Sequence, residues 1–212
     1  MSSQPRPGVF LVFEGGDGSG KSTQARRLAD HLAAEGHDVV LTREPGGTVL
    51  GQTLRTAVLH GEDLDPRTEA LIYAADRAHH VATLVRPALD RGAVVVCDRY
   101  IDSSVAYQGA ARGLGEDEIV QLSSWATGGL VPDLTLVLDL DTREAAGRRG
   151  DDPDRLEREA EPFHARVRET YLRRAATAPR RYAVIDSSRS RDDVHADVVA
   201  RVGEMLATGG GR

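Results

Sequence analysis

Short apolar runs and longer mixed segments alternate along this chain. The apolar runs span residues 9–13, 39–41, 93–97, 134–140 and 182–185, and each reads as a β-strand. The segments between them carry apolar residues three or four positions apart, which predicts helices after residue 20, after residue 140 and over about 51–60, 67–91, 116–127, 156–177 and 191–207. Strands this apolar, separated by helices, predict an α/β fold with a five-stranded parallel sheet flanked by helices on both faces.

The long helical region at 67–91 and the segment after the third strand carry more specific predictions. Pro87 is expected to bend or break the helix. Its inward stripe is expected to include Ala70, Leu71, Ala74 and Ala78. Residues 101–115 combine polar residues with three glycines, which indicates a pocket-lining loop. The sole tryptophan, Trp125, is expected in the core or at an interface.

Length and composition indicate one ordinary globular domain. We expect a single domain over residues 1–212, with flexible tails at 1–8 and 208–212. The net charge of −6 argues against nucleic acid or a membrane as a partner. No apolar run approaches the roughly 18 residues of a membrane span, and the N-terminus shows no signal-peptide pattern. The lone Cys97 cannot form an internal disulfide, so we expect a cytoplasmic protein.

A glycine-rich turn follows the first strand and opens the first helix. Residues 15–22 fit the pattern G-x-x-x-x-G-K-[ST] at every fixed position. The N–H groups of such a loop and of the helix N-terminus form a concave phosphate site, and glycine lets the backbone approach closely. Lys21 adds a positive charge at the outer phosphates, and the Ser22 hydroxyl can hold Mg²⁺. The predicted nucleoside triphosphate site comprises Gly15, Gly16, Asp17, Gly18, Ser19, Gly20, Lys21, Ser22 and Thr23.

Cations and a carboxylate stand where phosphoryl transfer needs them. Arg43 and Arg99 follow the second and third strands, and three further arginines follow the fourth: Arg148, Arg149 and Arg155. Because the carboxyl ends of parallel strands share one edge, we expect these cations to converge there. Asp98 ends the third strand, where a carboxylate would hold Mg²⁺ directly or through water. For each of the three later arginines, a solvated surface charge is an equal alternative.

Four motifs together resemble the thymidylate kinase family. They are the phosphate loop GGDGSGKST, TREPGG at residues 42–47, Asp98-Arg99-Tyr100 and Asp154-Arg155-Leu156-Glu157. The resemblance spans residues 9 to about 190. It implies a P-loop nucleoside monophosphate kinase-like fold with a short lid at about 142–158. It also implies transfer of the γ-phosphoryl group of ATP to dTMP, in dTTP biosynthesis, with Mg²⁺ as cofactor, and a homodimer formed through helix packing.

The resemblance implies a role for each matching residue around the acceptor phosphate and sugar. Arg43 and Arg99 would grip the 5′-phosphate, with Glu44 in the same substrate-binding turn. Asp17 would bind the 3′-hydroxyl of deoxyribose. Tyr107 would crowd the 2′ position and disfavour ribonucleotides.

The same resemblance implies how the base is read. Tyr73, where the family more often has phenylalanine, would stack on thymine, and Arg77 would donate to O4. Ser104 and Gln108 would lie near N3. Cytosine reverses the donor and acceptor of thymine at these two positions, and an unpaired buried donor costs about 1–3 kcal/mol. We therefore expect strong rejection of dCMP and weaker discrimination against dUMP.

Members of the family differ in the position of the catalytic arginine. Some carry it in the phosphate loop, at the position of Gly18, and others carry it in the lid. This chain has no loop arginine and an arginine-rich lid, so it resembles the second, bacterial type. The catalytic set is then Lys21, Asp98, Arg99 and the lid residues Arg148, Arg149 and Arg155. The sequence leaves open which lid arginine reaches the transferring phosphoryl group.

Two other functions remain compatible with a phosphate loop. A kinase of the same architecture could act on another nucleotide or on a nucleoside, with Glu44 or Asp98 as the base that activates a 5′-hydroxyl. The paired Arg43 and Arg99 argue instead for an acceptor that already carries phosphate. A nucleotide-dependent switch of the guanine-binding type should show an N-K-x-D stretch, and the sequence has none.

Overall fold

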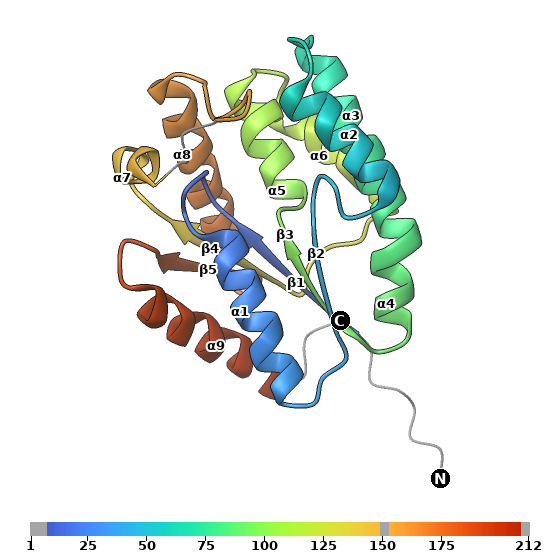
Figure 1. Cartoon of the computed structure of the whole chain (residues 1–212), viewed down its shortest axis with the longest axis vertical. Coiled ribbons are helices and arrows are strands. Elements are labelled where there is room, and N and C mark those ends of the chain that lie inside the picture. The colour runs from blue at the N-terminus through green and yellow to red at the C-terminus, as the bar shows by residue number, and fades with distance from the viewer. Residues whose placement is uncertain (1–7, 149–152, 209–212) are drawn as a thin grey trace.

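The structure is a computed structural model that describes residues 8–148 and 153–208. Its single sheet has the strand order β2-β3-β1-β4-β5, and all four strand pairs are parallel (Figure 1). The strands are β1 (Val9–Glu14), β2 (Val39–Arg43), β3 (Val94–Asp98), β4 (Leu134–Asp139) and β5 (Tyr182–Asp186). The predicted five-stranded parallel sheet is therefore confirmed.

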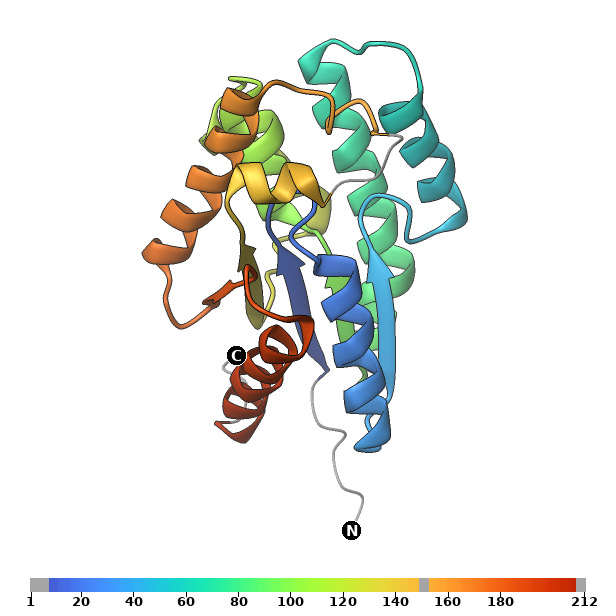
Figure 2. The same ribbon diagram turned by 60° about the vertical axis from the view of Figure 1, so that its left-hand side comes forward.

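Helices connect the strands and cover both faces of the sheet (Figures 1 and 2). On one face lie α1 (Lys21–Ala34) and α9 (Arg191–Ala207). The other helices lie on the opposite face or above the carboxyl edge: α2 (Val49–His60), α3 (Pro66–His80), the π-helix η1 (Val81–Val85), α4 (Arg86–Asp90), α5 (Ile101–Ser104), the π-helix η2 (Val105–Ala111), α6 (Glu116–Thr127), α7 (Thr142–Gly147) and α8 (Glu161–Thr177).

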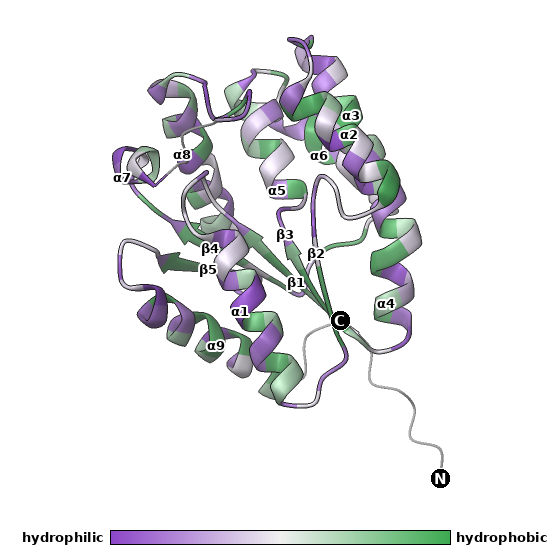
Figure 3. Ribbon diagram, in the orientation of Figure 1, coloured by the Kyte–Doolittle hydropathy of each residue, from purple (hydrophilic) through white to green (hydrophobic). Residues whose placement is uncertain are grey.

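Alternate residues of the central strand build the two halves of the core. Leu11 and Phe13 join the cluster under α1 and α9, whereas Phe10 and Val12 join the cluster under η1 and α4. All four side chains are fully buried, and burial of each contributes roughly 1.5–3 kcal/mol. Figure 3 shows the result: the strands are hydrophobic along their length, and the helices mix both kinds of residue. A strand buried on both faces needs no polar face, which explains the unbroken apolar runs.

The segment after β3 lines the cavity as predicted, but residues 101–111 are helical, so the prediction of a loop was wrong for that part of 101–115. Residues 101–111 form α5 and η2 in direct succession. Val105 and Ala106 are fully buried there. Of the three glycines that suggested a loop, Gly109 lies within η2, and Gly113 and Gly115 follow it with positive φ angles of 73° and 96°. The polar residues of this segment therefore project from a helix of defined direction.

The buried face of α3 differs from the predicted apolar stripe. Ala70 and Ala74 are buried as predicted, but Leu71 is 58% exposed. Polar side chains take the inward positions instead, among them Asp76, Arg77 and His80. Helical periodicity counts apolar residues, so it misplaces a helix whose inner face lines a polar site.

Three further sequence predictions have mixed outcomes. The helical region is not broken at Pro87: α3, the π-helix η1 and α4 follow one another directly, and Pro87 stands in the first turn of α4. Trp125 is 83% exposed, so it is not a core residue. The helix expected from about residue 156 begins only at Glu161. Most of the predicted tails (1–7 and 209–212) and the middle of the predicted lid (149–152) lie outside the described residues.

Candidate functional site

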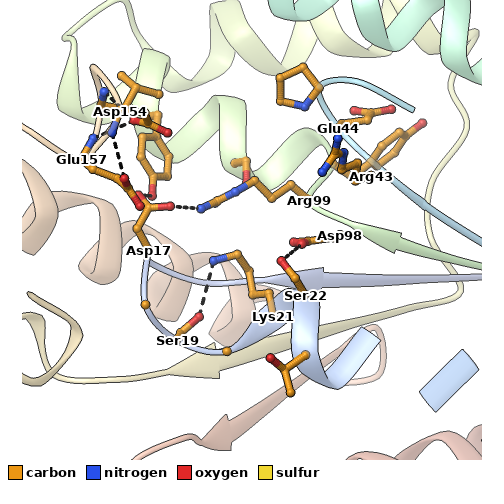
Figure 4. A pocket seen from close by; sticks show the side chains of 18 of the residues that line it. Asp17, Ser19, Lys21, Ser22, Arg43, Glu44, Asp98, Arg99, Asp154 and Glu157 are labelled. Carbon is orange, nitrogen blue, oxygen red and sulfur yellow. Dashed lines mark hydrogen bonds and ion pairs between the residues drawn. The ribbon is translucent and has the colours of Figure 1, made fainter. Parts of the chain in front are cut away.

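A cavity of about 600 Å³ opens at the carboxyl edge of the sheet (Figure 4). In the close view, Asp17, Asp154 and Glu157 lie on one side, and Arg43 and Glu44 lie on the opposite side. The sequence-predicted residues that line the cavity are Asp17, Gly18, Ser19, Gly20, Lys21, Ser22, Thr23, Arg43, Glu44, Tyr73, Arg77, Asp98, Arg99, Ser104, Tyr107, Gln108 and Arg148. The fold thus brings together residues from one end of the sequence to the other.

The phosphate loop joins β1 to α1 and depends on glycine where it passes α7. Gly18 has a φ of 84°, and a Cβ there would stand 2.5 Å from the carbonyl oxygen of Ala145. Lys21 begins α1, and its Nζ lies 2.7 Å from the carbonyl oxygen of Gly16. Burial, together with the charge of Arg99, lowers the pKa of Lys21 to about 8. The lysine is therefore held over the loop, at the place where outer phosphates would lie.

Ser22 and Asp98 offer oxygen ligands beside this loop. The Ser22 hydroxyl donates a short hydrogen bond to Asp98 Oδ2. Within the described part of the chain, Asp98 Oδ1 is buried and has no hydrogen-bond partner. Mg²⁺ prefers oxygen ligands and is commonly held by one or two protein groups together with substrate phosphates. No cluster of three or more histidine, cysteine or acidic residues that could hold a metal occurs among the described residues.

Arg99 is held in a left-handed backbone conformation directly after β3. Its φ is 72°, and its backbone N–H donates to the carbonyl of Phe13 on β1. The guanidinium pairs with Asp17 and also donates to the carbonyl oxygen of Gly15, 3.2 Å away. Tyr107 donates its hydroxyl hydrogen to the other oxygen of Asp17, at 2.7 Å. Asp17, Arg99 and Tyr107 thus form one connected group, and Arg43 lines the same cavity.

Glu44 and His80 hold Arg77 at the far end of the cavity. The Arg77 Nε donates to Glu44 Oε2 at 2.7 Å, and His80 Nδ1 lies 2.8 Å from Glu44 Oε1. All three side chains are buried. Arg77 also donates to Ser104 Oγ at 3.0 Å, and Tyr73 lines the cavity from the same helix. The base-reading residues predicted from the sequence are therefore adjacent, and Glu44 touches the cavity chiefly as the partner of Arg77.

The lid arginines lie in different places. Arg148 lines the cavity and donates to the carbonyl oxygen of Ser187, 2.9 Å away, in the turn after β5. Arg155 is 7% exposed and turns away from the cavity, because it donates to the carbonyl of Val58 and pairs with Glu69 at 2.5 Å. Arg149 lies outside the described residues. The three arginines were expected to converge on the cavity. Of the two that the structure describes, Arg148 lies at the cavity and Arg155 does not.

Arg55 is a cavity residue that the sequence analysis missed. It projects from α2 and donates to the carbonyl oxygen of Pro45 at 3.1 Å. Burial, together with the charge of Arg43, lowers its pKa from the ordinary value. A single arginine on an amphipathic helix gives no local signal of a site. Only the fold shows that it lies beside Arg43.

Glu14 is the second residue that the sequence analysis missed. Its carboxylate, fully buried at the end of β1, accepts hydrogen bonds from the backbone N–H of Tyr100 and of Ser103 and from the Ser103 hydroxyl. Burial, with a contribution from the nearby Asp102, raises the pKa of Glu14 to about 7. It fixes the turn that carries Arg99. A charged residue at the end of an otherwise apolar strand was a signal that could have revealed it.

Comparisons with known proteins give a consistent result. A family model described as thymidylate kinase matches residues 13–198. The chain is 55% identical over 208 residues to the thymidylate kinase of Clavibacter michiganensis subsp. michiganensis, covering 95% of this chain and 98% of that protein. It is 57% identical over 201 residues to that of Leifsonia xyli subsp. xyli, covering 93% and 95%. The crystal structure of thymidylate kinase from Ehrlichia chaffeensis superposes with a TM-score of 0.78 at 34% identity, covering 93% of this chain and 99% of that one.

None of the helices within residues 8–148 and 153–208 is long and apolar enough to cross a bilayer.

Proposed function

The chain belongs to the thymidylate kinase family, and on that basis we propose which of its residues carry out each part of the reaction. It is an ATP-dependent dTMP kinase, with the P-loop nucleoside monophosphate kinase-like fold, that transfers the γ-phosphoryl group of ATP to dTMP and gives dTDP and ADP. One observation carries the residue assignments: the phosphate loop, Arg43 with Arg99, and Arg77 with Gln108 all line one cavity.

At the donor end, residues 15–23 bind the phosphates of ATP through their N–H groups, and Lys21 adds its charge at the outer phosphates. The family uses a divalent metal, and we propose that it is Mg²⁺, held by Ser22 and Asp98. The oxygen-only donor set and the unpartnered Asp98 Oδ1 support this. When bound, the metal supplies charge that neutralises the phosphates.

At the acceptor end, Arg43 and Arg99 bind the 5′-phosphate of dTMP. Asp17 binds the 3′-hydroxyl, and its bond to Tyr107 places that phenol against the sugar. Phosphoryl transfer needs alignment and charge neutralisation more than covalent help from the protein. Arg43 and Arg99 stand at the ends of neighbouring strands, so their two guanidinium groups can align and neutralise an acceptor that already carries a phosphate.

At the base end, Tyr73 stacks on thymine, Arg77 donates to O4, and Ser104 and Gln108 lie near N3. Glu44 contributes by holding the guanidinium of Arg77, since both of its oxygens are engaged by Arg77 and His80. A guanidinium fixed in this way meets an amino group in cytosine and loses its acceptor. This supports rejection of dCMP.

Of the lid arginines, we propose that Arg148 contacts ATP, because it lines the cavity beside the turn after β5. Arg149 is proposed as a second cation of the lid. Arg155 would have to leave Glu69 to reach a phosphate, so in the conformation described it anchors the end of the lid. The lid is taken as residues 142–158 of a single domain that spans the chain.

We propose that the protein works in the cytoplasm as a homodimer. A free, buried Cys97 suits a reducing compartment. Leu71 on α3 and Trp125 on α6 are apolar side chains exposed on neighbouring helices, and such residues suit a contact between two copies.

The test is ADP release from Mg·ATP with purified protein and separate acceptors: dTMP, dUMP, dCMP, dGMP, thymidine or none. Rapid turnover with dTMP, slower turnover with dUMP and negligible turnover with the rest is expected. Turnover with thymidine would move the assignment to a nucleoside kinase, and equal ADP release without an acceptor would indicate an ATPase switch.

A further inference from the structure

Glu69 on α3 is a fully buried carboxylate to which the reaction as assigned above gives no role. Its Oε1 accepts a hydrogen bond from Gln108 Nε2 at 2.7 Å. Its Oε2 accepts from Arg155 at 2.5 Å and from Arg112 at 3.4 Å. The two cations thus hold one oxygen, and the side-chain amide of Gln108 meets the other.

The Glu69 carboxylate determines the orientation of the Gln108 side-chain amide. An ionised carboxylate only accepts hydrogen bonds, so the NH₂ group of Gln108 must face Glu69 and the carbonyl oxygen must face away from it. Gln108 lines the cavity, and within the described part of the chain no hydrogen bond engages its Oε1. The amide therefore presents an acceptor toward the bound base.

We infer that Glu69 is a positioning residue for base selection, acting through Gln108. The inference rests on the proposed placement of Gln108 near N3 of the pyrimidine. Thymine and uracil carry a hydrogen at N3 and can donate to Oε1 of Gln108. The N3 of cytosine is an acceptor, so it would face another acceptor there. Glu69 thereby selects keto pyrimidine nucleotides over cytidine nucleotides without touching the base.

Arg155 and Arg112 make this arrangement rigid. Both arginines pair with Oε2 of Glu69, Arg155 at 2.5 Å and Arg112 at 3.4 Å, so Oε1 stays directed at the amide of Gln108. Arg155 directly follows Asp154 of the lid, so the same carboxylate ties the lid end to the base-reading end of the cavity.

Glu69→Gln is the first test. A glutamine at this position can donate to Gln108 Oε1, which lets the amide reverse and present its NH₂ group to the base. The ratio of kcat/KM for dTMP to that for dCMP should fall at least about tenfold, and the dUMP to dCMP ratio should fall with it. If dCMP turnover is too slow to measure, its inhibition constant against dTMP replaces it. Arg112→Met is the matched control. It removes the more distant cation, 3.4 Å from Glu69, but leaves the closer pairing with Arg155 and the Gln108 contact, so the ratio should stay within about twofold.

Two further variants separate the inference from the proposed site and from a loss of folding. In a Gln108→Leu background, adding Glu69→Gln should leave the ratio unchanged. The exchange variant E69Q/Q108E should regain the dTMP preference, because a carboxylate at position 108 again presents an acceptor.

The outcomes assign any failure to one of the two proposals. An unchanged ratio in Gln108→Leu itself would overturn the placement of Gln108 and this inference with it. A changed ratio in Gln108→Leu with an unchanged ratio in Glu69→Gln would overturn the inference alone. If Glu69→Gln does not fold, the exchange variant decides: a dTMP preference supports the inference, and its loss contradicts it.

Discussion

Arg99 connects the donor and acceptor ends of the cavity through its contacts with Gly15 and Asp17. Because it is assigned to the acceptor phosphate, Arg99→Ala should lower kcat/KM for dTMP by roughly 10²–10³-fold. ATP affinity, measured by titration without acceptor, should change by less than about threefold. Arg99→Lys keeps the charge but not the planar fork, so it should recover part of the activity. An equally steep loss of ATP affinity would show that Arg99 serves the donor instead.

Lys21 should make ATP capture depend on pH. Its pKa of about 8 lies below the ordinary value of 10.5, so the free enzyme loses this charge as the pH rises through 8. The value of kcat/KM for ATP should therefore decline above pH 8. Bound phosphates stabilise the charged form and raise the pKa, so kcat at saturating ATP should decline only at higher pH.

The contrast between the two pH profiles is the measurement that checks this assignment. Lys21→Arg stays charged, so its kcat/KM for ATP should lack the decline near pH 8 whatever its absolute rate. A wild-type profile that stays flat to pH 9.5 would contradict the lowered pKa of Lys21.

Single side chains were predictable where a short motif fixes their role. Residues 17–23 of the phosphate loop and the Asp98-Arg99-Tyr100 triplet line the cavity, because their spacing places them directly after buried strands. Arg155 shows the limit, since its partner Glu69 lies 86 positions away and no local pattern distinguishes an anchor from a catalytic cation. The direction of an arginine is set by the fold around it, not by its neighbours in sequence.

At the scale of elements, the phosphate loop fits against α7 only with glycine at position 18. Gly18→Ala forces a Cβ against the Ala145 carbonyl in a positive-φ conformation. We expect a loss of about 1–3 kcal/mol in the free energy of unfolding, measured by urea denaturation. Gly16→Ala is the matched control, because a Cβ there meets no atom within 4 Å and should cost less than about 1 kcal/mol. Equal losses would show that the contact with α7 is not what the loop requires.

Glu14 ties the end of β1 to the start of α5, and this link should depend on pH. Its pKa rises from 4.5 to about 7 on folding, so between these values the folded protein holds a proton that the unfolded chain releases. The stability contributed by Glu14 is thus complete below pH 4.5 and is lost as the pH rises through 7. Glu14→Gln cannot ionise. Its free energy of unfolding relative to wild type should therefore rise between pH 5 and pH 8 by on the order of 1–3 kcal/mol.

Urea denaturation of both proteins at the two pH values checks this expectation. Glu144→Gln removes a carboxylate at an exposed position of α7 and is the control: its change between the two pH values should be smaller than that of Glu14→Gln. A constant difference for Glu14→Gln would show that the carboxylate is ionised in the folded protein across this range.

Elements were predictable from the sequence where burial follows a simple period. The five strands lie close to the runs predicted for them. For the three central strands, β1, β3 and β4, the reason is that a strand covered on both faces must be almost wholly apolar. The edge strands β2 and β5 are apolar as well, although Leu41 and Val184 are exposed. The helix at 101–111 and the polar inner face of α3 were missed for one reason. Both line the cavity, so polar residues and small residues stand where a core helix would carry apolar ones. Pattern rules fail at sites because sites depart from the pattern of the core.

At the scale of the whole molecule, the sheet gathers into one cavity residues that lie more than 100 positions apart in sequence. The order β2-β3-β1-β4-β5 places β1, with the phosphate loop, beside β3, which ends at Asp98. The donor and acceptor ends therefore lie on adjacent strands. This proximity could be expected from a parallel sheet, but the pairing of β1 with both β3 and β4 comes only from the three-dimensional fold.

The exposed side of the molecule at α3 and α6 leads to the last prediction. Leu71 and Trp125 are 58% and 83% exposed, on helices that contact each other. If two copies meet here, Leu71→Glu and Trp125→Glu should each weaken the dimer at least tenfold, measured by light scattering over a concentration series. Val184→Glu is the control, because Val184 is 51% exposed on β5, at the other edge of the sheet (Figure 1). A monomeric wild type, or equal weakening by Val184→Glu, would contradict this interface.

Dissociation of the dimer should also weaken dTMP binding, because α3 carries Leu71 on its exposed side and Tyr73 and Arg77 on its buried side. Without the second copy, α3 would be packed against the rest of the protein on its buried side and open to solvent on the other. The KM for dTMP should then rise in Leu71→Glu while the KM for ATP stays close to that of wild type, since the phosphate loop is attached to β1 and α1. Raising the protein concentration should restore the dTMP KM in proportion to the dimer formed, which separates lost assembly from local damage to α3.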